Sequence, residues 1–403
     1  MSPHGALRHH AMRDGFTATS RVGNSPGASL NHDPYPHSAP TLQAIPTLSP
    51  ATTETFAAAA PPAHALPATP QTVRWGSIDP TAASVLSVGS GARLDVEAVS
   101  HHAGDAPELM IDEGLRTIWS AFPEHERGPG VHVLTGPVAV AGARPGGAVA
   151  VRIESTAPRV PYGSNCAANW GLLHSDFGKE RITVYRLDEN GGAFPTTAHP
   201  EFGYDFRSRP VYDVPGWLSP ADARVDEPFS RPVRIPVRPH FGVIGVLPPG
   251  TEPVSTVPPG AFGGNVDNWR FGQGATIFFP VFHEGAGVYV GDPHFAQGDG
   301  EVCGTAIEAS MNATIRVAVV DDIAIRTPLL ETATHWFTHG FGDDLDAAAL
   351  MAVREMVALL RWRVGLSADD AYSLVSVAGD LGVTQVVDGV LGAHCGIDRS
   401  IFA

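Results

Sequence analysis

Lysine is almost absent from this 403-residue chain: Lys179 is the only one, and all other basic residues are arginine or histidine. Aspartate and glutamate outnumber lysine and arginine by 42 to 26, so the formal net charge is −16. This balance argues against nucleic acid as a partner, because proteins that bind it need clustered basic surface. The sequence also lacks an apolar run of about eighteen residues, so it predicts no transmembrane helix and no membrane partner.

Cysteine is scarce as well. The three cysteines, Cys166, Cys303 and Cys395, are widely spaced. They form no C-x-x-C metal motif and no disulfide framework, which excludes the small disulfide-rich class. Such usage is typical of the reducing cytoplasm, where we expect this protein to reside.

Residues 1–64 differ in composition from the rest of the chain. They are dominated by Ala, Pro, Ser, Thr, His and Gly and show no apolar periodicity. A segment of this kind cannot bury enough surface to offset its ordering entropy. We therefore predict a disordered N-terminal extension over 1–64 and a folded domain over 65–403.

Beyond Arg74, apolar and polar residues alternate in short runs, as in half-buried strands. The runs are 93–99, 149–154, 181–187, 275–282, 288–290 and 314–320. Helical periodicity appears only late, over 345–364 before Gly365 and over 368–378 after a capping box that starts at Ser367. Strands first and helices last predict a β-dominated fold, between all-β and α+β, with β-sandwich-like layers and a C-terminal helical hairpin.

Chemically active side chains concentrate in residues 291–308, which also contain four glycines. A strand that ends near Val290, a turn and a returning strand from Glu301 would bring four side chains together: Asp292, His294, Asp299 and Glu301. Carboxylate oxygens with an imidazole suit a divalent metal and an activated water. The alternative is a polar hairpin loop in which the aspartates only make turn hydrogen bonds.

The same segment resembles the signature of the acetamidase/formamidase family, which hydrolyses short aliphatic amides to carboxylate and ammonia. Further motifs keep the family's order: Leu66–Asp79, Ser100–His101, Val131–Pro137, Ala143–Gly147, Pro161–Gly163, Phe241–Pro248, Pro258–Asp267, Pro280–Gly285 and Val383–Asp388. The chain departs from the family's pattern at two places. His102 stands where the family usually has an acidic residue, and Gly146-Gly147 stands where it usually has Gly-Asp in a turn. The resemblance implies a catalytic domain over 65–403 that acts as a hydrolase on C–N bonds of linear amides such as formamide and acetamide.

Several amidase mechanisms are disfavoured by this sequence. Schemes that need a catalytic lysine would have to use Lys179, whose surroundings lack their motifs. The G-x-S-x-G nucleophile elbow is absent too. A metal-activated water is therefore favoured, since Zn²⁺ lowers the pKa of bound water to about 7 and polarises a carbonyl. We expect a divalent metal cofactor, Zn²⁺ in the first place, with Ca²⁺ as the alternative.

Candidate ligands for this metal come from three parts of the sequence. They are Asp292, His294, Asp267, Asn265, His101 and His132. Asn265 and Asp267 are two residues apart after a glycine turn, which is also a common Asx-turn pattern. Neighbouring residues on a strand point opposite ways, so at most one of His101 and His102 is expected to bind. The resemblance favours His101.

Glu301 is the predicted proton shuttle. It heads an apolar segment, and burial would raise its carboxyl pKa towards neutrality. Asp299 is the second candidate for this catalytic role, and Cys303, on the same face as Glu301, is a rival nucleophile. Phe262 and Trp269 are expected to bind the substrate's acyl group, although aromatic residues near strands commonly belong to the core.

Two other functions stay open at this point. One is a non-catalytic β-sandwich that binds a small ligand or Ca²⁺, although His294 argues against an oxygen-only Ca²⁺ site. The other is a hydrolase of a different C–N bond that uses Cys303. We further expect a small-molecule amide as the substrate and a homo-oligomer as the assembly.

Overall fold

The structure is a computed structural model that describes residue 56 and residues 63–110, 112–167, 170–177, 180–190, 194–205 and 224–402. The disorder predicted for residues 1–64 falls almost entirely outside these residues, and so does Lys179. The first strand begins at Ala63. Among the described residues, no helix is long and apolar enough to cross a membrane.

Strands dominate the chain, with 41% of the residues in strands and 16% in helices, which confirms the predicted fold class. The strands are β1 Ala63–Leu66, β2 Val73–Trp75, β3 Ser77–Ile78, β4 Leu86–Val88, β5 Arg93–Ala98, β6 Val133–Val140, β7 Ala148–Ala167, β8 Arg181–Leu187, β9 Thr197–Asp205, β10 Ile235–Pro236, β11 His240–Gly245, β12 Val254–Ser255, β13 Gly263–Asn265, β14 Thr276–Pro280, β15 Val288–His294, β16 Glu308–Val320, β17 Leu329–Glu331, β18 His335–Gly342, β19 Gly379–Val383 and β20 Leu391–Asp398. The α-helices are α2 Glu113–Ala121, α3 Leu345–Val364 and α4 Ala368–Ala378.

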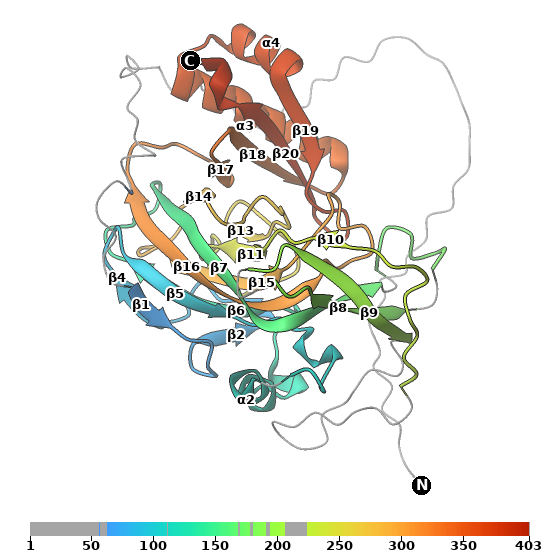
Figure 1. Ribbon diagram of the computed structural model, residues 1–403. Coiled ribbons are helices and arrows are strands. Elements are labelled where there is room, and N and C mark those ends of the chain that lie inside the picture. Colours follow the sequence, from blue (N-terminus) through green and yellow to red (C-terminus); the bar gives the residue numbers. More distant parts are fainter. Residues whose placement is uncertain are drawn as a thin grey trace, which may run out of the picture. The chain divides into compact units, whose positions relative to one another are not determined.

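Two groups of strands enclose the largest hydrophobic core (Figure 1). In the first group β16 pairs antiparallel with β5 and β7, and β7 also pairs with β14 and β8. In the second group β15 lies between β11 and β6. Alternate residues of both groups, such as Val151 and Ile315 from one and Ile244 and Val290 from the other, are buried against each other. The groups are joined where His294 of β15 pairs with Glu308 of β16.

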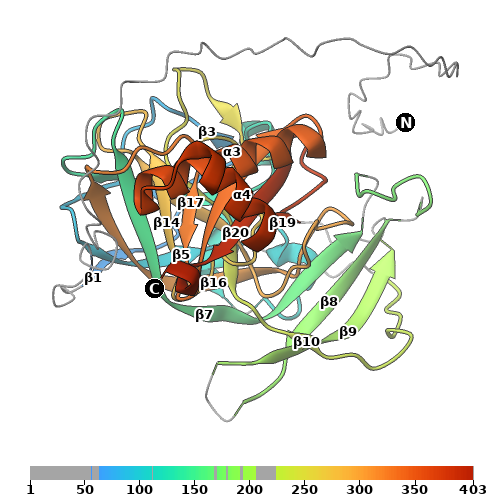
Figure 2. The same cartoon turned by 90° about the horizontal axis from the view of Figure 1, so that it is seen from above.

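The C-terminal part is a mixed layer of helices and strands. β18 pairs with β17 and β20, and β19 pairs with β20. Helices α3 and α4 lie across these strands (Figure 2). The predicted C-terminal helices are confirmed, but they do not end the chain, because β19 and β20 follow them. β20 is buried along most of its length, so it lacks the polar alternation that marks a half-buried strand.

Helix α2 contradicts the expectation that helices appear only late in the chain. It spans only nine residues and buries three side chains, Leu115, Ile118 and Trp119. The Asp112 side chain caps it by accepting a hydrogen bond from the Leu115 N–H at 3.1 Å. So short a segment gives little periodic signal in a sequence.

The predicted bounds of α3 and α4 are confirmed. Gly365 ends α3 in the left-handed conformation, with φ of 79°, which glycine adopts without a Cβ clash. Ser367 then caps α4, and its hydroxyl accepts a hydrogen bond from the Asp370 N–H at 3.1 Å. The local sequence alone determines both helix ends.

This cap yields a stability prediction. We expect Ser367→Ala to lower the free energy of unfolding by about 0.5–2 kcal/mol, because an N–H of the first turn loses its acceptor. Ser376→Ala is the matched control, since Ser376 is exposed in the same helix and alanine is the better helix former. Urea denaturation of both variants measures the difference. An equal change in the two would contradict the capping role.

Candidate metal centre

The site lies where the two groups of strands meet. β15 runs as far as His294 and the returning strand begins only at Glu308, so the hairpin expected between Val290 and Glu301 is wrong. Cross-strand pairing of His294 with His240 extends β15 beyond its apolar run. Asp292 and His294 thus lie in a strand, and residues 295–307 connect β15 to β16.

Four overlapping groups of side chains have ligand atoms close enough to hold a metal ion. They are His101, His132 and Asp292; Asp267, Asp292 and His294; His294, Glu301 and Glu308; and Asp267, Glu301 and Asp388. The groups share members and therefore form one continuous cluster, which combines imidazole nitrogens with carboxylate oxygens from segments far apart in the sequence.

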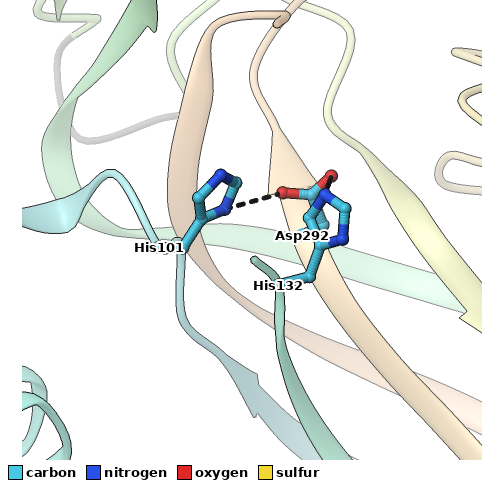
Figure 3. A group of neighbouring side chains, drawn as sticks. All are labelled: His101, His132 and Asp292. Carbon is cyan, nitrogen blue, oxygen red and sulfur yellow. Dashed lines mark ion pairs between the residues drawn. The ribbon is translucent and has the colours of Figure 1, made fainter. Parts of the chain in front are cut away.

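The first group has two imidazoles facing one carboxylate (Figure 3). The His101 Nδ1 lies 3.5 Å from Asp292 Oδ1, and the His132 Nε2 lies 3.6 Å from Asp292 Oδ2. These separations exceed a hydrogen bond, and they are close to the distance of about 3.3 Å between tetrahedral ligands about 2 Å from one Zn²⁺. Burial, with the neighbouring His102, lowers the pKa of His101 to about 3, so its lone pair is available at neutral pH.

The backbone orients the second imidazole. The His132 Nδ1 lies 3.1 Å from the carbonyl oxygen of Thr256. A carbonyl can only accept a hydrogen bond, so this contact places the proton on Nδ1 and leaves Nε2 to face Asp292. Metal-binding histidines are commonly oriented by such a contact.

His294 links the strands through both ring nitrogens. Its Nε2 lies 3.0 Å from Asp292 Oδ2 and 3.2 Å from Glu308 Oε2. Its Nδ1 lies 3.2 Å from His240 Nε2 and 3.1 Å from Gln297 Oε1. Burial alone would lower the pKa of His294, but the carboxylates of Glu308 and Asp292 raise it well above its usual range.

The cluster contains five carboxyl groups. One of them, Asp292, has a lowered pKa, and the other four have raised pKa values. Burial disfavours the charged form of Asp292, but the surrounding histidines hold its pKa well below its usual range. Burial raises the pKa of Asp267 to about 7 and that of Glu308 above its usual value, with Asp292 adding to both. Burial and the nearby Asp267 raise the pKa of Glu301 and of Asp388 well above their usual ranges.

Three of the carboxylate residues have unusual backbone conformations. Among the described residues, four that are not glycine have positive φ. Three of them belong to the cluster: Asp267 at 51°, Asp292 at 47° and Glu301 at 46°. Such conformations cost about 1–3 kcal/mol each and persist where the surroundings enforce them, often at functional sites.

The donor set fits a divalent cation. Several buried ligand atoms make no well-aligned hydrogen bond, namely His101 Nδ1, Asp292 Oδ1 and both oxygens of Asp267. Glu308 Oε2 has only the His294 ring nitrogen at 3.2 Å. A Cβ at Gly242 would lie 2.6 Å from Asp267 Oδ1 and 2.7 Å from Asp292 Oδ2, so glycine keeps the space between these ligands open. Two imidazoles and a carboxylate are also the donors of catalytic zinc sites.

Several predicted site residues lie outside the cluster. Asp299 is half exposed and accepts hydrogen bonds from Trp269 Nε1 at 2.8 Å and Arg270 Nη1 at 3.1 Å. Trp269 itself lines a surface pocket. Phe262 packs against the hydrophobic core and is in none of the four groups.

Two further candidates, Asn265 and Cys303, belong to none of the four groups of possible metal ligands. Asn265 is buried in β13, opposite Val243 of β11, and its Oδ1 has no partner. The Cys303 thiol accepts a hydrogen bond from Asn165 Nδ2 at 3.1 Å. His102 pairs with Asp105 at 2.8 Å, whereas His101 faces Asp292; the two histidines lie in a turn after β5, not on the strand that the prediction assumed.

Three side chains of the cluster and its surroundings were not predicted as ligands or positioning groups: His240, Gln297 and Asp388. The sequence predicts only a supporting or structural role for Glu308, which ends the signature segment. Each of the four lies inside, or next to, a motif that carries the family resemblance. Asp388 and Glu308 end their motifs, and that position was the available signal. His240 and Gln297 contact His294 only through the pairing of β11 with β15 and the path of the loop.

Residues 246–402 match the model of the Acetamidase/Formamidase family. A formamidase from Methylophilus methylotrophus is 31% identical over 230 residues, which cover 48% of this chain and 52% of that protein. An acetamidase from Mycolicibacterium smegmatis is 35% identical over 217 residues, which cover 44% of this chain and 50% of that protein. The chain thus spans about half the length of the curated relatives it matches.

Solved structures are similar over a larger part of the chain. The acetamidase from Bacillus halodurans has a TM-score of 0.65 at 27% identity, over 84% of this chain and 98% of that one. A predicted acetamidase/formamidase from Thermoanaerobacter tengcongensis has a TM-score of 0.64 at 25% identity, over 84% of this chain and 96% of that one. The resemblance predicted from the motifs is confirmed: residues 246–402 match the model of the acetamidase/formamidase family, and curated relatives named formamidase and acetamidase are similar to this chain.

Proposed function

We propose that this protein hydrolyses short linear amides, such as formamide and acetamide, to a carboxylate and ammonia with the help of a divalent metal ion. The observation that supports the proposal most is the cluster of His101, His132 and Asp292, next to Asp267 and His294, in a chain whose residues 246–402 match the family model. The named activities of the relatives, formamidase and acetamidase, agree with it.

His101, His132 and Asp292 would hold the ion, with Asp267 as a further donor; His294 could bind only after losing its proton, because its pKa is raised. An ion bound there would supply an activated water and polarise the amide carbonyl. The chain's own part is to keep these donors dry and oriented. Thr256 fixes the His132 ring, and His240 with Gln297 fixes the His294 ring.

Glu301 is the residue that we propose to carry the proton to the leaving nitrogen. An amide C–N bond breaks readily only if the nitrogen is protonated as it leaves. Glu301 is 7% exposed, and its carboxyl group is grouped with His294 and Glu308. Burial and the nearby Asp267 raise the pKa of this carboxyl group well above its usual range, which favours the proton-bearing form that a general acid needs.

Other parts of the proposal rest on the sequence alone. Phe262 and Trp269 stay predictions as contacts of the acyl group, and Cys303 stays the alternative nucleophile. Zn²⁺ as the ion, a homo-oligomeric assembly and a cytoplasmic location also stay predictions.

Removal of the metal tests whether amide hydrolysis by this protein needs a divalent ion. We expect dialysis against a chelator to abolish ammonia release from formamide and acetamide, and stoichiometric Zn²⁺ to restore it. The reason is that the carboxylate and imidazole donors cannot replace the ion's charge at the carbonyl oxygen. Ammonia release is measured with and without added metal, and elemental analysis verifies that the sample is metal-free. Full activity in that sample would contradict the metal mechanism, and loss of activity on thiol alkylation would then favour Cys303.

A methyl group at Gly242 should close the space between the ligands. We expect Gly242→Ala to lower metal affinity by at least about tenfold, as changes that displace metal ligands commonly do. Gly298→Ala is the matched control, because a Cβ there meets no atom within 4 Å. Metal content after dialysis at a fixed free Zn²⁺ concentration is the measurement. If both variants retain the same metal content as the parent chain, the ion is not bound between Asp267 and Asp292.

The shuttle is tested by two conservative substitutions. We expect Glu301→Gln to lower kcat by about 10²–10⁴-fold with metal content unchanged, because the amide cannot exchange the proton. Asp299→Asn should change kcat much less, since Asp299 is half exposed and paired with Arg270. Steady-state kinetics with acetamide and elemental analysis decide between them. A larger loss in the Asp299 variant would assign the role to Asp299, and loss of metal from the Glu301 variant would make Glu301 a ligand.

A further inference from the structure

A surface pocket of about 600 Å³ lies outside the metal cluster and is lined by Trp269. Its lining includes Arg238, Trp269, Arg270, His335 and Phe337. Phe194, from an earlier part of the sequence, also lines it. None of the described residues that line it is acidic. The lining thus carries positive charge from two arginines, opposite in sign to the net charge of the chain, −16.

Cations and aromatic rings are stacked along the wall of this pocket. The Arg238 and Arg270 guanidinium carbons lie 4.4 and 4.2 Å from the centre of the Trp269 ring. Arg270 also lies 5.3 Å from the Phe337 ring, which stacks on His335 at 5.5 Å and 20°. Such contacts hold a guanidinium group in place while its N–H donors stay available.

The two arginines differ in their ion pairs. Arg270 is paired with Asp299 at 3.1 Å, and the Trp269 indole N–H donates to the same carboxylate at 2.8 Å. Arg238 is exposed, and no acidic side chain among the described residues pairs with it. The pocket therefore presents one fixed guanidinium group that lacks a counter-ion, beside apolar rings.

We propose that this pocket binds a small planar organic carboxylate. The fork of N–H donors on Arg238 matches a carboxylate, which accepts two parallel hydrogen bonds. The rings of Phe194, Trp269 and Phe337 provide an apolar wall for a flat ligand body. A volume of about 600 Å³ suits a ligand far larger than acetamide.

The carboxylate has two conceivable sources: the small acid released by amide hydrolysis, or a larger aromatic acid. The aromatic wall favours the larger one, because acetate has no ring to bury. The pocket shares Trp269 with the predicted acyl contacts of the substrate, but the proposal uses neither a ligand of the metal cluster nor Glu301. It therefore stands even if the proposed amide hydrolysis fails.

Calorimetric titration of the full chain with three probes tests the proposal. Benzoate has both ring and charge, acetate has the charge alone, and benzyl alcohol has the ring alone. We expect benzoate to bind at one site per chain, at least about tenfold more tightly than either partial probe, since both halves of the ligand are recognised. Acetate that binds as tightly as benzoate would assign the pocket to the hydrolysis product and overturn the aromatic ligand.

Substitution of the arginine locates the site. Arg238→Ala should weaken benzoate binding by about 10- to 100-fold, because a charge-assisted hydrogen-bonded pair is lost. Arg234→Ala makes the same charge change four residues away at a side chain that is 77% exposed and does not line the pocket, and should leave the affinity within about twofold. Equal affinities in the two variants would overturn the proposal. Ammonia release from acetamide, measured in parallel, reports on the hydrolysis separately.

Discussion

The constraint on which this structure depends is the burial of five carboxylates in one place. Asp267, Asp292, Glu301, Glu308 and Asp388 share one cluster, and among the described residues no arginine or lysine forms an ion pair with any of them. Burying several negative charges together is costly unless protons or cations compensate them. The His294 imidazole, whose pKa the neighbouring carboxylates raise, compensates part of this charge, and a bound cation would compensate more.

The five carboxylates come from segments that are far apart in the sequence. Three of these residues, Asp267, Asp292 and Glu301, have the strained positive φ described above. β15 joins the two groups of strands at the pair His294–Glu308, and the segment after β19 brings Asp388 beside Asp267. The loop with Glu301 is held to that segment by the hydrogen bond from the Gly300 N–H to the Thr384 carbonyl oxygen at 2.9 Å. The C-terminal layer of α3, α4 and β18–β20 therefore does more than cover the core, because it contributes a residue to the site.

Local features were predictable from the sequence, and long-range ones were predictable only in part. The ends of α3 and α4 followed from Gly365 and Ser367, and the strands β5 and β8 from alternation alone. The pairing of His101 and His132 with Asp292 depends on strand order, which periodicity does not encode. The predicted strand from Glu301 is a loop as far as residue 307, because i and i+2 spacing cannot tell an extended loop from a paired strand. The contact of His240 with His294, and that of Asp388 with Asp267, join segments far apart in the sequence, so no local pattern predicts them.

X-ray absorption spectroscopy at the zinc edge of the purified full chain tests the central claim most directly, because it reports the atoms around the ion without reference to activity. The structure predicts a first shell of nitrogen and oxygen at about 2.0–2.1 Å, with the outer-shell scattering of at least two imidazole rings. It predicts no sulfur at about 2.3 Å, since Cys303 is in none of the four ligand groups. A sulfur-containing shell, or protein that takes up no zinc at all, would contradict the account.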